Sequence, residues 1–233
     1  MRILRPFSFL TLKAKVPQQI TSGDWEDREA ILQPGVNLFC WQRPINPEIE
    51  SYLEVLQQSD WPKIQQFVAV NELDENLEDI RKVLPSSQGV GSDAFFKDLR
   101  QLTSDFLRYS ENGSGTLHLR LVTDNACTKF HIDGYKLRLF TTYAGLGTEW
   151  LPESAVNRDG LGRGNGKIVR DIAQVRQMAP FEVGILKGEI PKSQAFTKGI
   201  VHRSPQISHL GEKRIILRID LWVENLFILS LGF

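Results

Sequence analysis

The sequence predicts an α+β protein in which an N-terminal helical layer packs against a C-terminal barrel or sandwich of short strands. Up to about residue 109, apolar residues mostly recur at helical spacing, and from residue 116 they alternate with polar ones. Asn-Gly-Ser-Gly at 112–115 separates the two patterns. We therefore expect a mainly helical layer over residues 1–115 and a β-rich part over residues 116–233, which together form one compact unit.

The N-terminal elements follow from apolar spacing and from Pro or Gly at their boundaries. A short buried strand is expected at 37–42, after an irregular start, and a helix at 47–59. Two further helices are expected at 64–70 and 73–83. The longest helix is expected at about 94–109, with Ser92 and Asp93 as its N-cap and a broad apolar face that packs on the core.

The C-terminal half reads as strands joined by turns that contain Gly or Pro. In the strand 116–123, the leucines take one face, and His118 and Arg120 take the other. In the last strand, the odd-numbered apolar residues suit packing against the helices, whereas Arg214, Arg218 and Asp220 share the opposite face. The strands are expected at 116–123, 136–143, 182–187, 194–197, 200–202 and 214–223.

The glycine-rich stretch at residues 159–167, Asp-Gly-Leu-Gly-Arg-Gly-Asn-Gly-Lys, lies between expected strands. It lacks the Gly-Lys-Ser/Thr ending of a phosphate-binding loop. We expect a flexible surface loop that could act as a lid over a site.

Composition excludes several classes of protein. The 28 Lys and Arg residues equal the 28 Asp and Glu residues, which argues against a main role in binding nucleic acid or anionic membranes. Cys40 and Cys127 are the only cysteines and form no CxxC pair, which excludes a disulfide framework and a thiolate zinc ribbon and fits a reducing cytoplasm. The apolar runs at 7–12 and 225–233 are too short for a signal-peptide core and for a membrane span, respectively.

The best candidate for a chemical site is the pair His131 and Asp133. Side chains two apart in an extended strand project to the same face, and an imidazole with a carboxylate is two-thirds of a two-His, one-carboxylate metal site. His202 offers the distant third ligand. We expect a mononuclear metal site with Fe(II) as its metal. His118 and His209 have no partner at ligand spacing, so surface or hydrogen-bonded roles are expected for them.

The surroundings of these residues resemble the prolyl-hydroxylase-like branch of the Fe(II)/2-oxoglutarate-dependent oxygenases. The matching features follow the His-x-Asp pair in order: Arg138, Tyr143, the turn Gly147-Thr148-Glu149-Trp150, the run Pro180–Gly184, and the basic residues 213–214 that open the last strand after His202. This resemblance implies a double-stranded β-helix (jelly-roll) barrel, with Fe(II) and 2-oxoglutarate as cofactors of a dioxygenase.

The resemblance also implies a cosubstrate site. The far carboxylate of 2-oxoglutarate needs a cation at a fixed reach, and Arg offers a planar fork for it. We expect Arg214 rather than Lys213 to bind this carboxylate, with Tyr143 hydrogen-bonded to it and Arg218 as a second polar barrel residue. Arg138 could contact substrate or cofactor, or could equally be a salt-bridge residue.

A closer resemblance runs through most of the chain and is densest at residues 119–220. The phrases KFHIDGYKLRLFTTYAGLGTEWLPE and HRSP are similar to those of a bacterial family known as domain of unknown function 1826. Its members are often encoded near zinc-responsive genes, which implies a link to metal homeostasis.

Two alternatives to an oxygenase therefore stay open. The first is a non-catalytic zinc or iron protein of metal homeostasis, because the same three residues would bind Zn(II) at least as tightly as Fe(II). The second is a cupin-like interaction module without metal. The sequence indicates no substrate and no oligomeric state.

Overall fold

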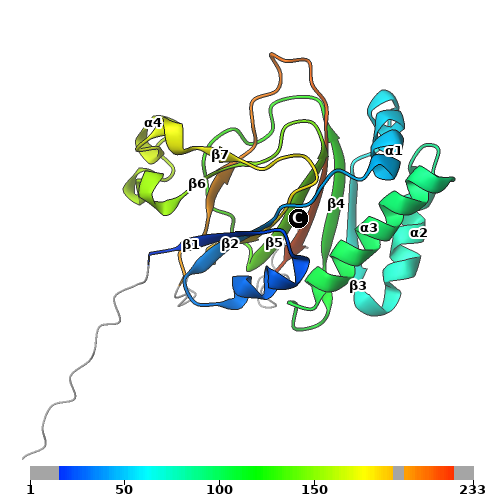
Figure 1. Ribbon diagram of the computed structural model, residues 1–233, viewed down its shortest axis with the longest axis horizontal. Helices are drawn as coiled ribbons and strands as arrows, with labels where there is room; N and C mark the ends of the chain where they lie inside the picture. Colours follow the sequence, from blue (N-terminus) through cyan, green and yellow to red (C-terminus); the bar gives the residue numbers. More distant parts are fainter. Residues whose placement is uncertain (1–15, 191–196, 223–233) are drawn as a thin grey trace, which may run out of the picture.

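A computed structural model describes residues 16–190 and 197–222 (Figure 1). Both apolar terminal runs, and residues 194–196 of the strand expected at 194–197, lie outside these ranges; Thr197 is described and is not in a strand. Within the described ranges, no helix combines the length and apolar character that crossing a bilayer requires.

In the described part of the chain, the core is a seven-stranded sheet to which both halves of the sequence contribute. Its strand order is β1-β2-β8-β5-β10-β4-β3, with β1 and β2 parallel and every other neighbouring pair antiparallel. In chain order, the strands are β1 (Gln18–Ser22), β2 (Val36–Trp41), β3 (Ile64–Ala69), β4 (Ser114–Val122), β5 (Leu137–Ala144), β8 (Val183–Lys187) and β10 (Arg214–Leu221). N-terminal strands thus form both edges of a sheet whose central strands come from the C-terminal half.

A second sheet has three short strands in the order β7-β6-β9. They are β6 (Glu149–Leu151), β7 (Arg176–Gln177) and β9 (Val201–Arg203). Apolar side chains from both sheets meet in one cluster, Leu38, Cys40 and Leu186 from the large sheet with Trp150, Met178 and Ile200. The face of the large sheet that points toward this cluster is called the inner face below.

Three helices cover the opposite face of the large sheet (Figure 1). They are α1 (Pro47–Gln58), α2 (Leu73–Val83) and α3 (Val90–Leu107). The odd-numbered residues of β10 pack with the apolar faces of these helices, which confirms the predicted orientation of this strand. The remaining helical segments are short: η1 (Trp25–Leu32), η2 (Val70–Glu72), η3 (Glu153–Ala155), η4 (Arg158–Gly160), α4 (Asn165–Ile168) and η5 (Ile172–Gln174).

Three predictions about the N-terminal elements are wrong. Residues 64–69 form strand β3 instead of a helix; Ile64 and Val68 are both buried, and a spacing of four puts residues on one face of a helix or of a strand. The longest helix begins at Val90, with Gly89 as its N-cap residue, so Ser92 and Asp93 lie within its first turn. The strand β1 and the helical segment η1 lie where an irregular chain was expected.

Candidate metal centre

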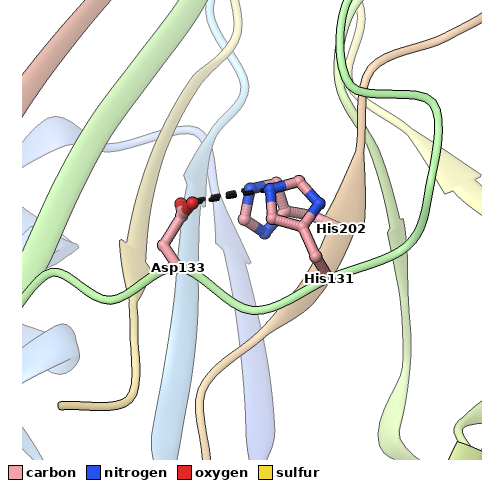
Figure 2. Close-up of side chains that lie close together, drawn as sticks. All are labelled: His131, Asp133 and His202. Atoms are coloured by element: carbon pink, nitrogen blue, oxygen red, sulfur yellow. Dashed lines mark ion pairs between the residues drawn. The ribbon is translucent and has the colours of Figure 1, made fainter. Parts of the chain in front are cut away.

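His131, Asp133 and His202 come together, as the sequence predicted (Figure 2). One ligand atom from each lies within 4.8 Å of the others. Nε2 of His202 is 3.2 Å from Oδ2 of Asp133, and Nε2 of His131 is 3.5 Å from Oδ1. The two histidines are joined by an antiparallel bridge, in which each backbone N–H donates to the other residue's carbonyl at 3.0 Å. This bridge explains how residues so distant in sequence share one site.

Backbone carbonyls orient both imidazole rings. Nδ1 of His131 lies 2.8 Å from the carbonyl oxygen of Lys129, and Nδ1 of His202 lies 3.3 Å from that of Ile200. A carbonyl can only accept, so each Nδ1 acts as a donor, and Nε2 is the ring atom of each histidine that remains for a metal ion. Two imidazoles that bind through Nε2 and a carboxylate are a donor set that suits Fe(II) or Zn(II), so the residues present fit the predicted metal.

A buried ion-pair chain holds the carboxylate of Asp133. Nη1 of Arg138 donates to Oδ2 of Asp133 at 2.5 Å, and Nε of Arg138 donates to Oδ1 of Asp220 at 2.6 Å. Nε2 of His118 lies 3.3 Å from the other oxygen of Asp220. Arg138 is therefore a salt-bridge residue that orients the predicted metal ligand. The role of Asp220 was missed, although its place on the polar face of the last strand was a signal for it.

These contacts keep the carboxylates ionised. Burial alone would raise the pKa of Asp133, but hydrogen bonds from His131 and His202 and the charge of Arg138 hold it well below the usual carboxyl range. The pKa of Asp220 is also lowered, since His118 and Arg138 outweigh its burial. The hydrogen bond to Asp133 raises the pKa of His131. The centre thus presents a charged carboxylate that is ready to bind a cation.

Arg214 is fully buried at the start of β10. Its Nε donates to the carbonyl oxygen of Leu146 at 2.5 Å, and its Nη2 donates to Oγ1 of Thr142 at 3.3 Å, whereas the buried Nη1 has no partner among the described residues. Burial lowers its pKa to about 10, so it stays charged at neutral pH. Lys213 points outward, and its Nζ donates to the carbonyl oxygen of Gln57. Among the described residues, this buried guanidinium thus keeps one donor free, and binding of a carboxylate by Arg214 stays a prediction.

Tyr143 lies on the other face of its strand. Its hydroxyl donates to Oδ2 of Asp98 at 2.6 Å, and its ring packs against Phe95 and Phe181 beneath the helices. The prediction that Tyr143 and Arg214 bind the same carboxylate is therefore wrong. Alternation along β5 explains the error, because it turns Thr142 rather than its neighbour toward Arg214.

The glycine-rich stretch at 159–167 is tied to the metal centre. Oδ1 of Asn165 accepts from the backbone N–H of Phe130 at 2.7 Å, and its Nδ2 donates to the carbonyl oxygen of Thr128 at 3.0 Å. The stretch lies at the surface, as expected, and contains two short helical turns, η4 and α4. Asn165, which opens α4, braces the segment that leads into His131.

The two cysteines are expected to differ sharply in reactivity. Cys40 is buried, and burial together with Glu182 raises the pKa of its thiol to about 12, whereas Cys127 is exposed. Because the thiolate is the reactive form, iodoacetamide at pH 8 should alkylate only Cys127 in the folded protein and both cysteines in urea. Mass spectrometry of the peptides measures this, and labelling of Cys40 without urea would contradict the described packing.

The sequence matches the family model described as "Protein of unknown function (DUF1826)" over residues 22–220. The chain belongs to this family. No curated protein matches this DUF1826 member significantly. Among solved structures, it is similar to the dioxygenase for auxin oxidation from rice, with a TM-score of 0.51 and 10% identity over 90% of this chain and 83% of the other.

A second similar structure is the Arabidopsis thaliana dioxygenase for auxin oxidation in complex with 2-oxoglutarate. Its TM-score is 0.48, with 10% identity over 89% of this chain and 92% of that chain. At such identity, the rice structure supports a shared fold, and the chemistry of the DUF1826 protein has to be argued from its own residues.

Proposed function

We propose that this DUF1826 protein is an Fe(II)- and 2-oxoglutarate-dependent oxygenase built on a jelly-roll barrel. One observation carries the proposal: two imidazole Nε2 atoms and one carboxylate converge, with each Nδ1 engaged by a carbonyl. The buried Arg214, which has a free donor, adds support for an anionic cosubstrate. The two sheets that meet through an apolar cluster, and the likeness to the rice dioxygenase, support the barrel.

In this proposal, each residue has a separate task. His131, Asp133 and His202 would hold Fe(II), and iron with 2-oxoglutarate would supply the oxidising chemistry when both are bound. Arg138 fixes the orientation of the Asp133 carboxylate. Arg214 binds the far carboxylate of 2-oxoglutarate through its guanidinium fork, in a buried position that excludes competing water.

Release of succinate tests the activity. Wild-type protein incubated in air with Fe(II) and 2-oxoglutarate should form succinate slowly even without substrate, and His131→Ala should form none above the protein-free rate. Mass spectrometry of succinate is the measurement. A non-catalytic metal protein would bind the ion and form no succinate. Metal binding without 2-oxoglutarate binding and without succinate would therefore contradict the oxygenase proposal.

Arg214→Met should weaken the binding of 2-oxoglutarate selectively. A hydrogen bond to a charged group contributes about 1.5–3 kcal/mol, so we expect the Kd to rise by about 10- to 100-fold while Fe(II) affinity is kept. Calorimetric titration of the iron-loaded protein without oxygen measures both constants. Lys213→Met is the matched control, because its ammonium group contacts Gln57 at the surface. Equal weakening in both variants would contradict the assignment.

A further inference from the structure

Three arginines share the inner face of two neighbouring strands. Arg214 and Arg218 alternate along β10, and Arg120 on β4 lies opposite Ile216, between them. Alternation puts all three on the face away from the helices, because Leu117 and Leu119 of β4 pack in the helical core. Diagonal neighbours across an antiparallel pair are about 7–8 Å apart, within reach of long side chains. The three guanidinium groups can therefore serve one ligand-binding region.

Each of these arginines has a buried donor without an acceptor among the described residues. The atoms are Nε of Arg120, Nη1 of Arg214 and Nε of Arg218. Nε of Arg218 forms an ion pair with Oδ2 of Asp220 at 3.0 Å, but in the described part of the chain neither atom makes a hydrogen bond. A buried unsatisfied donor costs about 1–3 kcal/mol. Three such donors on one face call for an explanation, and a ligand that supplies acceptors is one.

The nearby carboxylates are already engaged. Asp133 and Asp220 both pair with Arg138, and Asp220 also lies beside His118. Glu149, which lies near enough to Arg214 to influence its pKa, pairs with Arg203 at 2.5 Å. In the proposed function, 2-oxoglutarate would pair with Arg214. Arg120 has no ion pair within the described ranges, and Arg218 only shares Asp220. Within the described ranges, the inner face thus keeps positive charge that no carboxylate of the protein neutralises and that the proposed cosubstrate, paired with Arg214, would leave in place.

We propose that the substrate carries an anionic group, a carboxylate, sulfonate or phosphate, that Arg120 and Arg218 bind beside the metal centre. Its role as a substrate site rests on the proposed oxygenase function. Exposure separates the two sites: Arg214 is fully buried, whereas the side chain of Arg218 is 23% exposed and that of His131 is 33% exposed. The fully buried Arg214 suits the small cosubstrate. The half-buried Arg120 and Arg218 suit an anion that enters from solvent.

Inorganic sulfate is a suitable probe of this site. Full-length protein is loaded with Mn(II), which does not react with oxygen as Fe(II) does, and with 2-oxoglutarate, and sulfate is then titrated by calorimetry. We expect saturable binding in wild type and a Kd about 10- to 100-fold weaker in Arg120→Met and Arg218→Met, with the Kd of 2-oxoglutarate changed by less than about twofold. Arg100→Met is the matched control, because Arg100 is an exposed arginine paired with Asp74.

Different results separate this inference from the oxygenase proposal. Sulfate binding that both variants keep, or that is lost only in Arg214→Met, would overturn the inference. Sulfate binding that depends on Arg120 and Arg218, in a protein that binds no 2-oxoglutarate, would support the anion site and count against the oxygenase. If Arg218→Met does not fold, Arg218→Lys replaces it and should keep the Kd of sulfate within a few fold of wild type. The Kd of sulfate for Arg120→Met then decides whether the inference holds.

Discussion

His202→Ala should remove nearly all metal binding. The side chain of His202 is only 8% exposed, its Nε2 lies 3.2 Å from Asp133, and the bridge to His131 holds its backbone. Loss of a residue that merely orients a ligand typically costs about 10- to 100-fold in affinity, so loss of the ligand itself should exceed 100-fold for Fe(II) or Zn(II). Equilibrium dialysis followed by metal analysis gives the Kd for Fe(II) and the Kd for Zn(II).

Thermal unfolding gives an independent reading of the same variant. Metal that binds only the folded state raises the Tm with metal concentration, so added Zn(II) should stabilise wild type and leave His202→Ala unchanged. His209→Ala is the matched control, because His209 is an exposed histidine of the same chain. If His202→Ala retained the metal content of wild type, the three residues would not be the metal centre.

Asp220→Asn should destabilise the fold more than a typical point mutation. Asp220 is fully buried, and its carboxylate lies 2.6 Å from Nε of Arg138 and 3.0 Å from Nε of Arg218. The amide keeps the shape but removes the charge that these guanidinium groups face. Breaking a buried ion pair on one side costs about 3–5 kcal/mol, a large part of the roughly 5–15 kcal/mol that holds a domain folded. Urea unfolding measures the change in free energy.

The control for this variant is Asp74→Asn. Asp74 forms an exposed ion pair with Arg100, and such pairs contribute at most about 1 kcal/mol. Similar losses in both variants would show that the charge of Asp220 is not coupled to its buried neighbours. Metal affinity should also fall in Asp220→Asn. Arg138 orients the carboxylate of Asp133, and in this variant Arg138 would lose its own ion pair with Asp220.

The effect of Asp220 also has a defined pH dependence. Its pKa is lower in the folded protein than in the unfolded chain, so its ionised form is favoured by folding. The stability that it contributes is fully present above the ordinary carboxyl pKa of about 4 and is lost as the pH falls through the lowered folded value. The difference between wild type and Asp220→Asn should therefore shrink below about pH 4 and stay constant at neutral pH.

The likeness to the rice structure agrees with an α+β fold, and several local predictions about this fold are confirmed. The helices near 47–59 and 73–83, the strand near 136–143 and the two faces of β10 follow from residue spacing alone. The spacing of Ile64 and Val68 shows the limit of this reasoning, since helix and strand both put them on one face. Pairing with β4 decided in favour of a strand.

In the candidate site, too, residue spacing predicted some features and strand pairing decided the others. The His-x-Asp spacing was enough to predict that His131 and Asp133 lie close together, although only His131 takes part in a β-bridge and residues 132–133 form no regular strand. That His202 bridges His131, and that Arg138 reaches Asp220 82 positions away, depends on which strands are neighbours and in what register. The error at Tyr143 is of the local kind, because alternation along β5 turns Thr142 toward Arg214 and Tyr143 toward Asp98 beneath the helices.

Residue types and local periods in the sequence were thus sufficient to name His131, Asp133 and His202, which converge, and Arg214, which is buried. The tertiary structure alone aligned Arg120 with Arg214 and Arg218. The physical reason is that a period determines which residues share a face of their own strand, whereas contacts between strands depend on non-local pairing that no local pattern encodes.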